Sequence, residues 1–280
     1  MESLRWWRLF TPPTGRMVAV ALDHGLTGEP VEFRGLERFT EAVSRIAAAG
    51  PDALLVSTGQ AKHLAKLALP LPALIVRVDV TNAYQRPTPQ QIYDRVLADA
   101  SLIALRADAA AVIVNLLSVP GHPEATSESI ATILSIRAAC EAYAIPLIVE
   151  VMVLRSQGDG TLRPGARIDE LVGLVRLAVE LGADAIKVTP PDELDAFGEL
   201  VQVAGVPLLA LGGARGETQA VLQQTAILVR HGASGVIFGR NVFQHPNPPA
   251  MVQALRHLVH RSGTVEEALR IVEEVTMSKT

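Results

Sequence analysis

The amino-acid sequence predicts a single (β/α)8 barrel of the TIM type, and two observations favour this fold. The chain has 280 residues, a length at which α/β barrels form one domain. Short apolar runs alternate along the whole chain with helical runs rich in Ala, Leu, Glu and Arg, as in repeated strand–helix units on a parallel sheet. No linker, low-complexity tract or charge run interrupts this alternation. An open doubly wound sheet with fewer strands is the alternative, but eight strand–helix units favour the closed barrel.

The individual elements follow from the same pattern. Strands are expected at residues 17–22, 53–56, 73–80, 111–116, 146–153, 185–188, 207–211 and 235–238. Helices are expected between the strands, for example at residues 36–49, 90–105, 127–143, 168–181, 193–203 and 217–231. Gly50, Gly182 and Gly232 each follow a helical run, where glycine adopts the left-handed backbone that ends a helix. The predicted domain is one unit over residues 1–280, with an N-terminal segment (1–15), the barrel (16–260) and a C-terminal helix (261–280).

Composition and charge exclude several functions. The net charge is -4, and no cluster of Lys and Arg marks a surface for nucleic acid or for a membrane. The N-terminus is too polar for a signal peptide and no segment spans a bilayer, so we expect a cytoplasmic protein. Charged residues make up 19% of the chain, below the roughly 25% of an average soluble protein. We therefore expect a homo-oligomer, in which copies of the chain cover part of the surface.

Two groups of residues are assigned to packing. Cys140, the only cysteine, lies in an apolar helical run, so a buried and inert thiol is expected. Trp6, Trp7 and Phe10 are expected to close the barrel floor or to form a subunit contact. Neither group is counted in the candidate site.

Alternation within the strands points ionisable side chains into the barrel, because successive residues of a barrel strand face the axis and the helices in turn. In strand 73–80 the even-numbered residues are all apolar and are expected to face the helices: Leu74, Val76, Val78 and Val80. Ile75, Arg77 and Asp79 then face the axis. The same alternation in four other strands adds further polar residues on the axis: Asp23, Asn115, Glu150 and Lys187.

Ionisable groups in a confined interior are costly unless they pair. A structural ion-pair network is one interpretation of this cluster. Most of the groups, however, lie near the carboxyl ends of their strands, where barrel active sites are built. The pattern therefore favours a functional site.

Two glycine turns complete the same end of the barrel. The seventh strand runs into Gly212 and Gly213, and the eighth runs into Gly239 and Arg240. Glycine lets backbone N–H groups approach an anion, and the loops after strands 7 and 8 are where barrels commonly hold a phosphate. Together the two turns predict a phosphate site.

This set of residues suits carbonyl chemistry. A neutral Lys187 amine can attack a ketone or aldehyde, and the resulting iminium is an electron sink for breaking or forming a carbon–carbon bond. Asp23 and Glu150 are the candidates for proton transfer. The histidines are scattered without ligand spacing, so neither a metal nor another cofactor is expected. The remaining candidates for binding substrate or phosphate are His24, Arg77, Asp79, Asn115, Gly212, Gly213, Gly239 and Arg240.

Four segments carry a resemblance to the archaeal-type class I fructose-bisphosphate aldolase family: VALDHG, AIKVTP, LLALGGARGET and GASGVIFGRNVFQHPNPPAM. This group also contains aminodideoxyheptulosonate synthases and thiolase-like autoinducer-2 processing enzymes. The resemblance covers nearly the whole chain, from about Arg16 to about Leu258. It implies a Schiff base on Lys187, proton transfer assisted by Asp23, and substrate phosphate held at the Gly-Gly and Gly-Arg turns.

The residues after the fifth strand depart from that family. Archaeal-type aldolases carry Tyr-Pro-Arg-Gly there, with the tyrosine as general acid, whereas this sequence has no tyrosine in the stretch from Glu150 to Gly158. The run IVEVMV is similar instead to the matching strand of tagatose-bisphosphate and sulfofructose-phosphate aldolases, which has a glutamate at this point. Asn115 stands where those relatives often have a second lysine.

The leading hypothesis is a metal-independent class I aldolase that cleaves or forms a carbon–carbon bond in a phosphorylated ketose. A transferase of the same superfamily is the first alternative, using the lysine for transaldol, transketol-like or acyl transfer. A non-catalytic barrel that binds a phosphorylated metabolite is the second alternative. An inward lysine with two carboxylates favours an enzyme over a silent binder, which needs only the glycine turns.

Overall fold

A closed barrel of eight parallel strands forms the centre of the protein in its computed structural model, which describes residues 3–10, 13–29, 31–67 and 70–277. In order around the ring the strands are β1 (Met17–Ala21), β2 (Ala53–Ser57), β3 (Ala73–Arg77), β6 (Ala111–Ser118), β7 (Leu147–Ser156), β9 (Ala185–Val188), β10 (Leu208–Leu211) and β11 (Gly235–Phe238). Pairing of β11 with β1 closes the ring. The predicted TIM barrel is confirmed.

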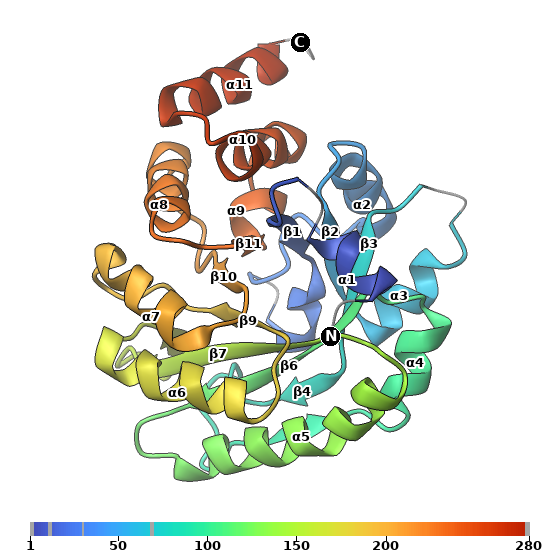
Figure 1. The fold of residues 1–280 in the computed structure, drawn as a ribbon, viewed down its shortest axis with the longest axis vertical. Helices are drawn as coiled ribbons and strands as arrows, with labels where there is room; N and C mark the ends of the chain where they lie inside the picture. Colours follow the sequence, from blue (N-terminus) through green and yellow to red (C-terminus); the bar gives the residue numbers. More distant parts are fainter. Residues whose placement is uncertain (1–2, 11–12, 30, 68–69, 278–280) are drawn as a thin grey trace.

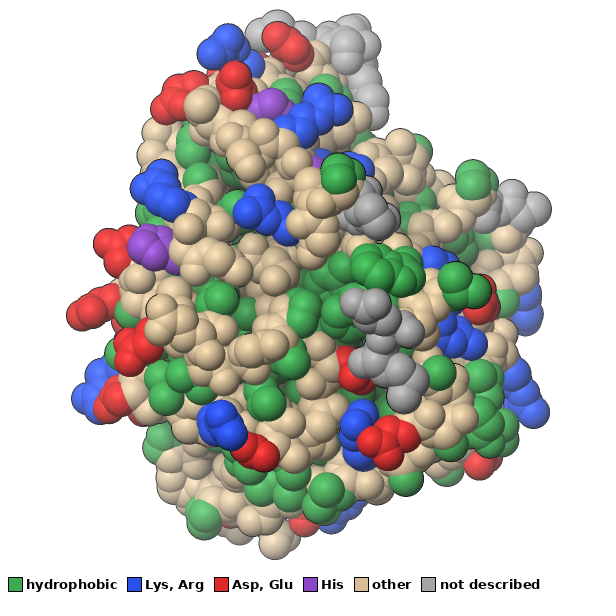
Figure 2. All heavy atoms as spheres, in the orientation of Figure 1, with side chains coloured by type: hydrophobic (Ala, Val, Ile, Leu, Met, Phe, Trp, Pro, Cys, Tyr) green, Lys and Arg blue, Asp and Glu red, His purple; other side chains and the backbone are tan. Residues whose placement is uncertain are grey.

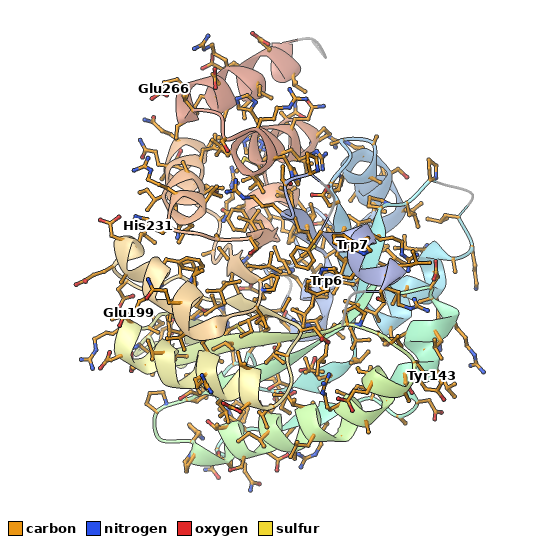
Figure 3. The ribbon with its side chains drawn as sticks, in the orientation of Figure 1. Trp6, Trp7, Tyr143, Glu199, His231 and Glu266 are labelled. Atoms are coloured by element: carbon orange, nitrogen blue, oxygen red, sulfur yellow. The ribbon has the colours of Figure 1, made fainter. Side chains whose placement is uncertain are left out.

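Helices surround this ring (Figure 1). The longer ones are α2 (Phe39–Ala47), α5 (Pro123–Ala142), α6 (Ile168–Glu180), α7 (Phe197–Ala204), α8 (Thr218–Arg230), α10 (Pro248–Arg261) and α11 (Val265–Met277). The shorter ones are α1 (Leu4–Leu9), α3 (Thr58–Leu64), α4 (Ala100–Arg106), α9 (Arg240–Phe243) and the 3-10 turns η1 (Asp23–Thr27) and η2 (Leu194–Ala196). Helix α11 packs on α10 and α8. Figure 3 labels four residues on or next to these outer helices: Tyr143, Glu199, His231 and Glu266.

Side-chain alternation separates two apolar layers. Val76 and Val78 pack in the layer between strands and helices, whereas Ile75 packs inside the barrel. On β1, Val20 lies in the outer layer and Ala19 in the inner one. Burial of each Val or Ile side chain stabilises the fold by roughly 1.5–3 kcal/mol. The alternation that the sequence predicts for these residues is confirmed, and with it the direction of the polar residues that follow them.

Helix α1 supplies side chains to the inner layer of the barrel. Phe10 is buried there, and its ring lies 4.4 Å from that of Trp6 between centroids. Arg8 Nη1 lies 2.7 Å from Asp108 Oδ2, which ties the helix to the turn before β6. The prediction that Trp6 and Phe10 pack against the barrel is confirmed. Trp7, in contrast, is largely exposed.

Two predicted elements between residues 73 and 105 are only partly right, since β3 covers the first part of the predicted strand and α4 (Ala100–Arg106) covers the last part of the predicted helix. The strand breaks after Arg77, and β4 (Asp79–Thr81) instead pairs antiparallel with β5 (Asp94–Val96), where a helix over 90–105 was predicted. Asp94 is fully buried in this pairing, and Asp99 has a left-handed φ of 56°, which prevents α4 from extending toward it. Val80, expected to face the helices, lines the cavity described below.

The outer surface has few exposed large apolar residues. On the face seen in Figure 2, apolar side chains gather where Figure 1 places α1, whose Leu4 and Trp7 are exposed. Cys140 is buried, and burial raises the pKa of its thiol to about 12, in agreement with the predicted inert thiol. Within the part of the chain that the structure describes, no helix has both the length and the apolar character needed to cross a membrane.

Candidate active site

A cavity of about 230 Å3 opens at the carboxyl ends of the barrel strands. The candidate residues named from the sequence all line it: Asp23, His24, Arg77, Asp79, Asn115, Glu150, Lys187, Gly212, Gly213, Gly239 and Arg240. They are brought together from seven of the eight barrel strands and the loops that follow them. Parallel strands end on the same side of the ring, which is why residues far apart in sequence meet here.

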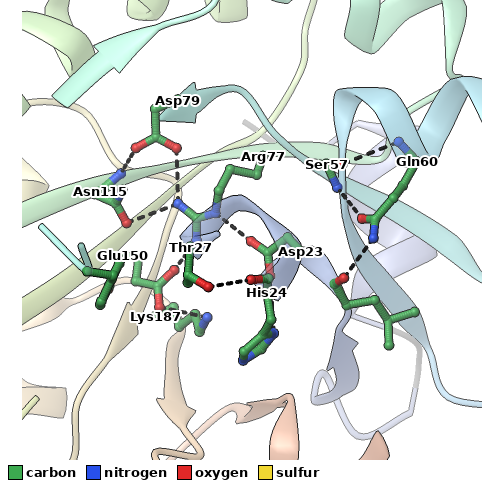
Figure 4. A network of polar contacts seen from close by, with 12 residues as sticks. Asp23, His24, Thr27, Ser57, Gln60, Arg77, Asp79, Asn115, Glu150 and Lys187 are labelled. Atoms are coloured by element: carbon green, nitrogen blue, oxygen red, sulfur yellow. Dashed lines mark hydrogen bonds and ion pairs between the residues drawn. The ribbon is translucent and has the colours of Figure 1, made fainter. Parts of the chain in front are cut away.

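Arg77, the last residue of β3, lies at the centre of the ionic cluster (Figure 4). Its Nε donates to Asp23 Oδ2 at 2.5 Å, and its Nη2 donates to Glu150 Oε2. Its Nη1 donates to Asp79 Oδ1 and to Asn115 Oδ1, each at 3.0 Å. Burial alone lowers the pKa of Arg77, but the three carboxylates outweigh it and raise the pKa well above its ordinary value. A planar guanidinium with four hydrogen bonds thus holds the two candidate acid/base carboxylates in place.

Glu150 and Lys187 face each other on adjacent strands. The register of β7 and β9 pairs the two residues directly, and Lys187 Nζ lies 2.7 Å from Glu150 Oε1. Both side chains are buried. Burial raises the pKa of Glu150, but the charges of Lys187 and Arg77 outweigh it and hold the pKa below its usual range. Glu150 is therefore an ionised acceptor within reach of the amine.

Asp23 and His24 begin the 3-10 turn η1 after β1. Burial raises the pKa of Asp23, but Arg77, His24 and Lys187 together outweigh burial and leave the pKa below its usual range. For His24 burial dominates and lowers the pKa to about 4, so the imidazole is neutral at pH 7. Its Nδ1 lies 3.8 Å from Asp23 Oδ1 and has no hydrogen-bond partner among the described residues. Buried polar atoms are normally satisfied, so this nitrogen is available to a ligand.

A pair of buried carboxyl groups supports Arg77 from the side away from Lys187. Asp79 on β4 and Asp94 on β5 share a hydrogen bond, and Asp94 Oδ2 also accepts from the hydroxyl of Ser129 at 2.9 Å. Burial, then the neighbouring Asp79, raises the pKa of Asp94 to about 9. Asp94 is therefore protonated at pH 7 and donates to Asp79. Asp79 in turn accepts from the backbone N–H of Asn115 at 2.6 Å.

The two glycine turns lie beside each other at the cavity. A side chain at Gly212 would lie 2.8 Å from the Phe238 ring, and one at Gly239 would lie 2.2 Å from Cε1 of His24. Asn241 links the turns, since its Nδ2 donates to the Gly212 carbonyl and its Oδ1 accepts from the Gly216 N–H. Glycine is required at 212 and 239 by these close approaches.

Arg240 projects into the cavity and forms an ion pair. Its Nη1 lies 2.6 Å from Glu32 Oε2, on the loop after β1. Among the described residues its buried Nε has no hydrogen-bond partner. The guanidinium of Arg240 thus pairs with Glu32 through Nη1, and its buried Nε–H can donate to a ligand.

Several residues of the cavity are absent from the sequence-based prediction: Glu32, Tyr84, Arg86, Thr161 and Arg163. Most lie on loops or on the short added strand β8 (Leu162–Pro164), where no periodicity indicates direction. Tyr84 could have been predicted from its position in the sequence, because it follows the third strand and therefore lies at the end of the barrel where active sites are built. No group of three or more His, Cys, Asp or Glu side chains suited to a metal ion occurs among the described residues, and the expectation of a metal-free site stays a prediction.

The chain belongs to the DeoC/LacD aldolase family, whose model matches residues 17–245. It is 30% identical over 278 residues to an uncharacterised aldolase of Saccharolobus solfataricus, covering 97% of this chain and 99% of that one. It is also 30% identical over 264 residues to 2-amino-4,5-dihydroxy-6-oxo-7-(phosphonooxy)heptanoate synthase of Streptomyces griseus, covering 94% of this chain and 92% of the synthase.

A solved structure of a Schiff-base-forming fructose-1,6-bisphosphate aldolase is similar in fold as well as in sequence. It matches with a TM-score of 0.75 and 25% identity, covering 91% of this chain and 98% of that one. The resemblance named from the sequence is confirmed, and the chain is a member of a Schiff-base aldolase family.

Proposed function

We propose that this protein is a class I aldolase in which Lys187 forms a Schiff base with a phosphorylated ketose and a carbon–carbon bond is cleaved or formed. The observation that carries the proposal is the Lys187–Glu150 pair, with Nζ 2.7 Å from Oε1, inside the cavity that also holds both glycine turns. Ionised Glu150 accepts a proton from the amine, which leaves the nitrogen lone pair free to attack the substrate carbonyl.

The remaining cluster residues receive two kinds of role. Asp23 shares acid/base duty with Glu150, because Arg77 holds both carboxylates at the cavity. His24 binds a substrate oxygen through its neutral ring, which has a nitrogen without a protein partner among the described residues. Arg77, Asp79 and Asn115 were assigned to substrate binding from the sequence. We now assign Arg77 and Asp79 a positioning role, because their hydrogen bonds run mainly to each other and to neighbouring cluster residues.

Phosphate is assigned to the turns at Gly212–Gly213 and Gly239–Arg240. Two observations support this: side chains are excluded from both turns at close range, and Arg240 keeps a buried Nε donor. The heptanoate synthase and the fructose-1,6-bisphosphate aldolase to which the chain is similar both carry a phosphorylated group in their names. A phosphorylated ketose therefore fits both the amine and the turns.

The second candidate function is synthesis by condensation, with transfer of an enamine carbon fragment to an aldehyde. The similarity to a heptanoate synthase over 94% of the chain favours it. The same Lys187 iminium serves both directions, because the enamine is common to cleavage and condensation.

Borohydride trapping tests the proposal. The protein is incubated with fructose 1,6-bisphosphate, tagatose 1,6-bisphosphate, fructose 1-phosphate or dihydroxyacetone phosphate, reduced, and measured by intact mass and peptide mapping. We expect a reduced adduct on Lys187 and none on the Lys187→Ala variant, with Lys62 and Lys66 as internal controls. Absence of an adduct with every sugar would leave the phosphate-binding, non-catalytic barrel as the remaining interpretation.

A further inference from the structure

Tyr84 lines the cavity, although it lies on a segment outside the eight barrel strands. It lies in the connection between β4 and β5, next to the buried residues Asn82 and Ala83. Asn82 braces this connection, since its Nδ2 donates to the Gln91 carbonyl at 3.0 Å and its Oδ1 accepts from the Tyr93 N–H at 2.8 Å. The backbone on one side of Tyr84 is thus fixed by hydrogen bonds, which orients the ring toward the cavity.

The hydroxyl of Tyr84 is held only loosely within the protein. It donates to the thioether sulfur of Met152 at 3.3 Å, and sulfur is a weak acceptor that an oxygen of a substrate can replace. Met152 follows Glu150 by two residues on β7, so it lies on the same face of the strand and one step nearer the cavity mouth. The charged groups that act on the phenol are those of the cluster, with Glu150 first and Arg77 next.

The two carboxylates act as proton acceptors when substrate binds, so the proposed aldol chemistry can use a separate group that is already protonated. Glu150 is tied to the amine and to Arg77, and Asp23 is also tied to Arg77, so both are ionised acceptors. An enamine formed at Lys187 must gain a proton on carbon before the product leaves. Burial raises the pKa of Tyr84 well above its ordinary value, so its hydroxyl stays protonated and can donate.

We propose that Tyr84 is the catalytic acid that protonates the enamine carbon. This inference rests on the proposed Schiff-base function. In cleavage the substrate hydroxyl gives its proton to a carboxylate, and the electron pair of the breaking carbon–carbon bond forms the enamine. The enamine π pair then takes the Tyr84 proton, which makes a C–H bond, an iminium on Lys187 and a phenolate. Water relays the carboxyl proton back to the phenolate, and hydrolysis of the iminium frees the ketone. Protons and electrons balance over the cycle.

Proton exchange into dihydroxyacetone phosphate tests the assignment separately from bond cleavage. Incubation in D2O exchanges a carbon-bound proton only when the enamine is formed and reprotonated, and NMR reads this directly. We expect Tyr84→Phe to give the wild-type borohydride adduct at Lys187 while its exchange rate falls by about 10²-fold or more. Tyr143→Phe, at an exposed tyrosine on the outside of the barrel, is the matched control and keeps the wild-type rate.

The outcomes separate the two proposals. No adduct on the wild-type protein would overturn the Schiff-base function, and the role of Tyr84 with it. An adduct on Tyr84→Phe with a wild-type exchange rate would overturn the role of Tyr84 alone. If Tyr84 has only a structural role, Tyr84→Phe lowers the melting temperature but leaves the ratio of the exchange rate to the yield of borohydride adduct unchanged.

A second measurement covers the case in which Tyr84→Phe fails to fold. The chain has three tyrosines, so in a Tyr93→Phe, Tyr143→Phe background Tyr84 is the only one. Fluorinated tyrosine incorporated there is a stronger acid and ionises at lower pH. We expect the exchange rate at one neutral pH to change with the acidity of the phenol, and a rate equal to that of the unfluorinated protein would contradict the proposal.

Discussion

Lys187 Nζ and Glu150 Oε1 lie 2.7 Å apart on neighbouring parallel strands whose register places the two residues directly opposite each other. The same carboxylate accepts from Arg77, so its orientation does not depend on the lysine. When the amine is consumed in a Schiff base, Glu150 therefore stays in place beside the new iminium. A carboxylate that is pre-positioned in this way needs no rearrangement to act in proton transfer.

The Glu150→Gln variant separates a catalytic role of Glu150 from a purely structural one. The variant keeps the shape of the side chain and removes its proton affinity, so kcat is expected to fall by about 10²–10⁴-fold. Glu199→Gln, on the exposed side of α7, is the control and keeps the wild-type kcat. A lower melting temperature with near-normal turnover would show instead that Glu150 serves only as a partner of Arg77.

Arg240→Ala tests the phosphate site. Loss of a charge-assisted hydrogen bond costs about 1.5–3 kcal/mol, so KM for a phosphorylated substrate is expected to rise roughly 10- to 100-fold while kcat changes little. Steady-state kinetics measure both constants, and Arg176→Ala, at an exposed arginine of α6, is the matched control. An unchanged KM would place the phosphate elsewhere.

Gly239→Ala tests the close packing of the second glycine turn. The added methyl would lie 2.2 Å from Cε1 of His24, while the backbone φ of −106° at Gly239 lies outside the left-handed region that favours glycine. We expect a clear drop in melting temperature, because the imidazole must leave its position. Adding His24→Ala removes the obstacle and should restore part of the loss, as a double-mutant cycle would measure. If the two losses simply add, the imidazole is not the obstacle.

Asp94→Asn tests the buried carboxyl pair through the pH dependence of stability. The pKa of Asp94 is about 9 in the folded protein and about 3.9 in an unfolded chain, so the folded state binds the extra proton. Its contribution to stability is complete below about pH 4 and is lost as the pH rises to about 9. Asparagine can make the same two hydrogen bonds without titrating.

Urea unfolding at pH 5, 7 and 9 provides the measurement for this carboxyl pair. The Asp94→Asn protein is expected to lose less stability than the wild type between pH 5 and pH 9. Asp192→Asn, at an exposed aspartate, is the control and follows the wild type. Parallel curves for Asp94→Asn and the wild type would contradict a protonated Asp94.

The sequence by itself determined the barrel and the direction of its central side chains. Strand alternation is a local property, because whether a side chain faces the barrel axis or the helices depends only on the position of its residue along the strand. For that reason the inward direction of Arg77, Glu150 and Lys187 could be predicted without knowing their partners. The glycine turns were equally visible, since glycine at a strand end lets the backbone turn tightly and approach a ligand closely.

Only the tertiary structure decided what those side chains contact. The pairing of β4 with β5 replaced the first part of a predicted helix, because burial of Asp94 beside Asp79 depends on a neighbouring segment rather than on local propensity. The sequence shows that no tyrosine follows Glu150 on the fifth barrel strand, but not that Tyr84 reaches Met152 from another loop. Loop residues have no periodicity to indicate direction, so their place in the site is set by long-range packing and hydrogen bonds.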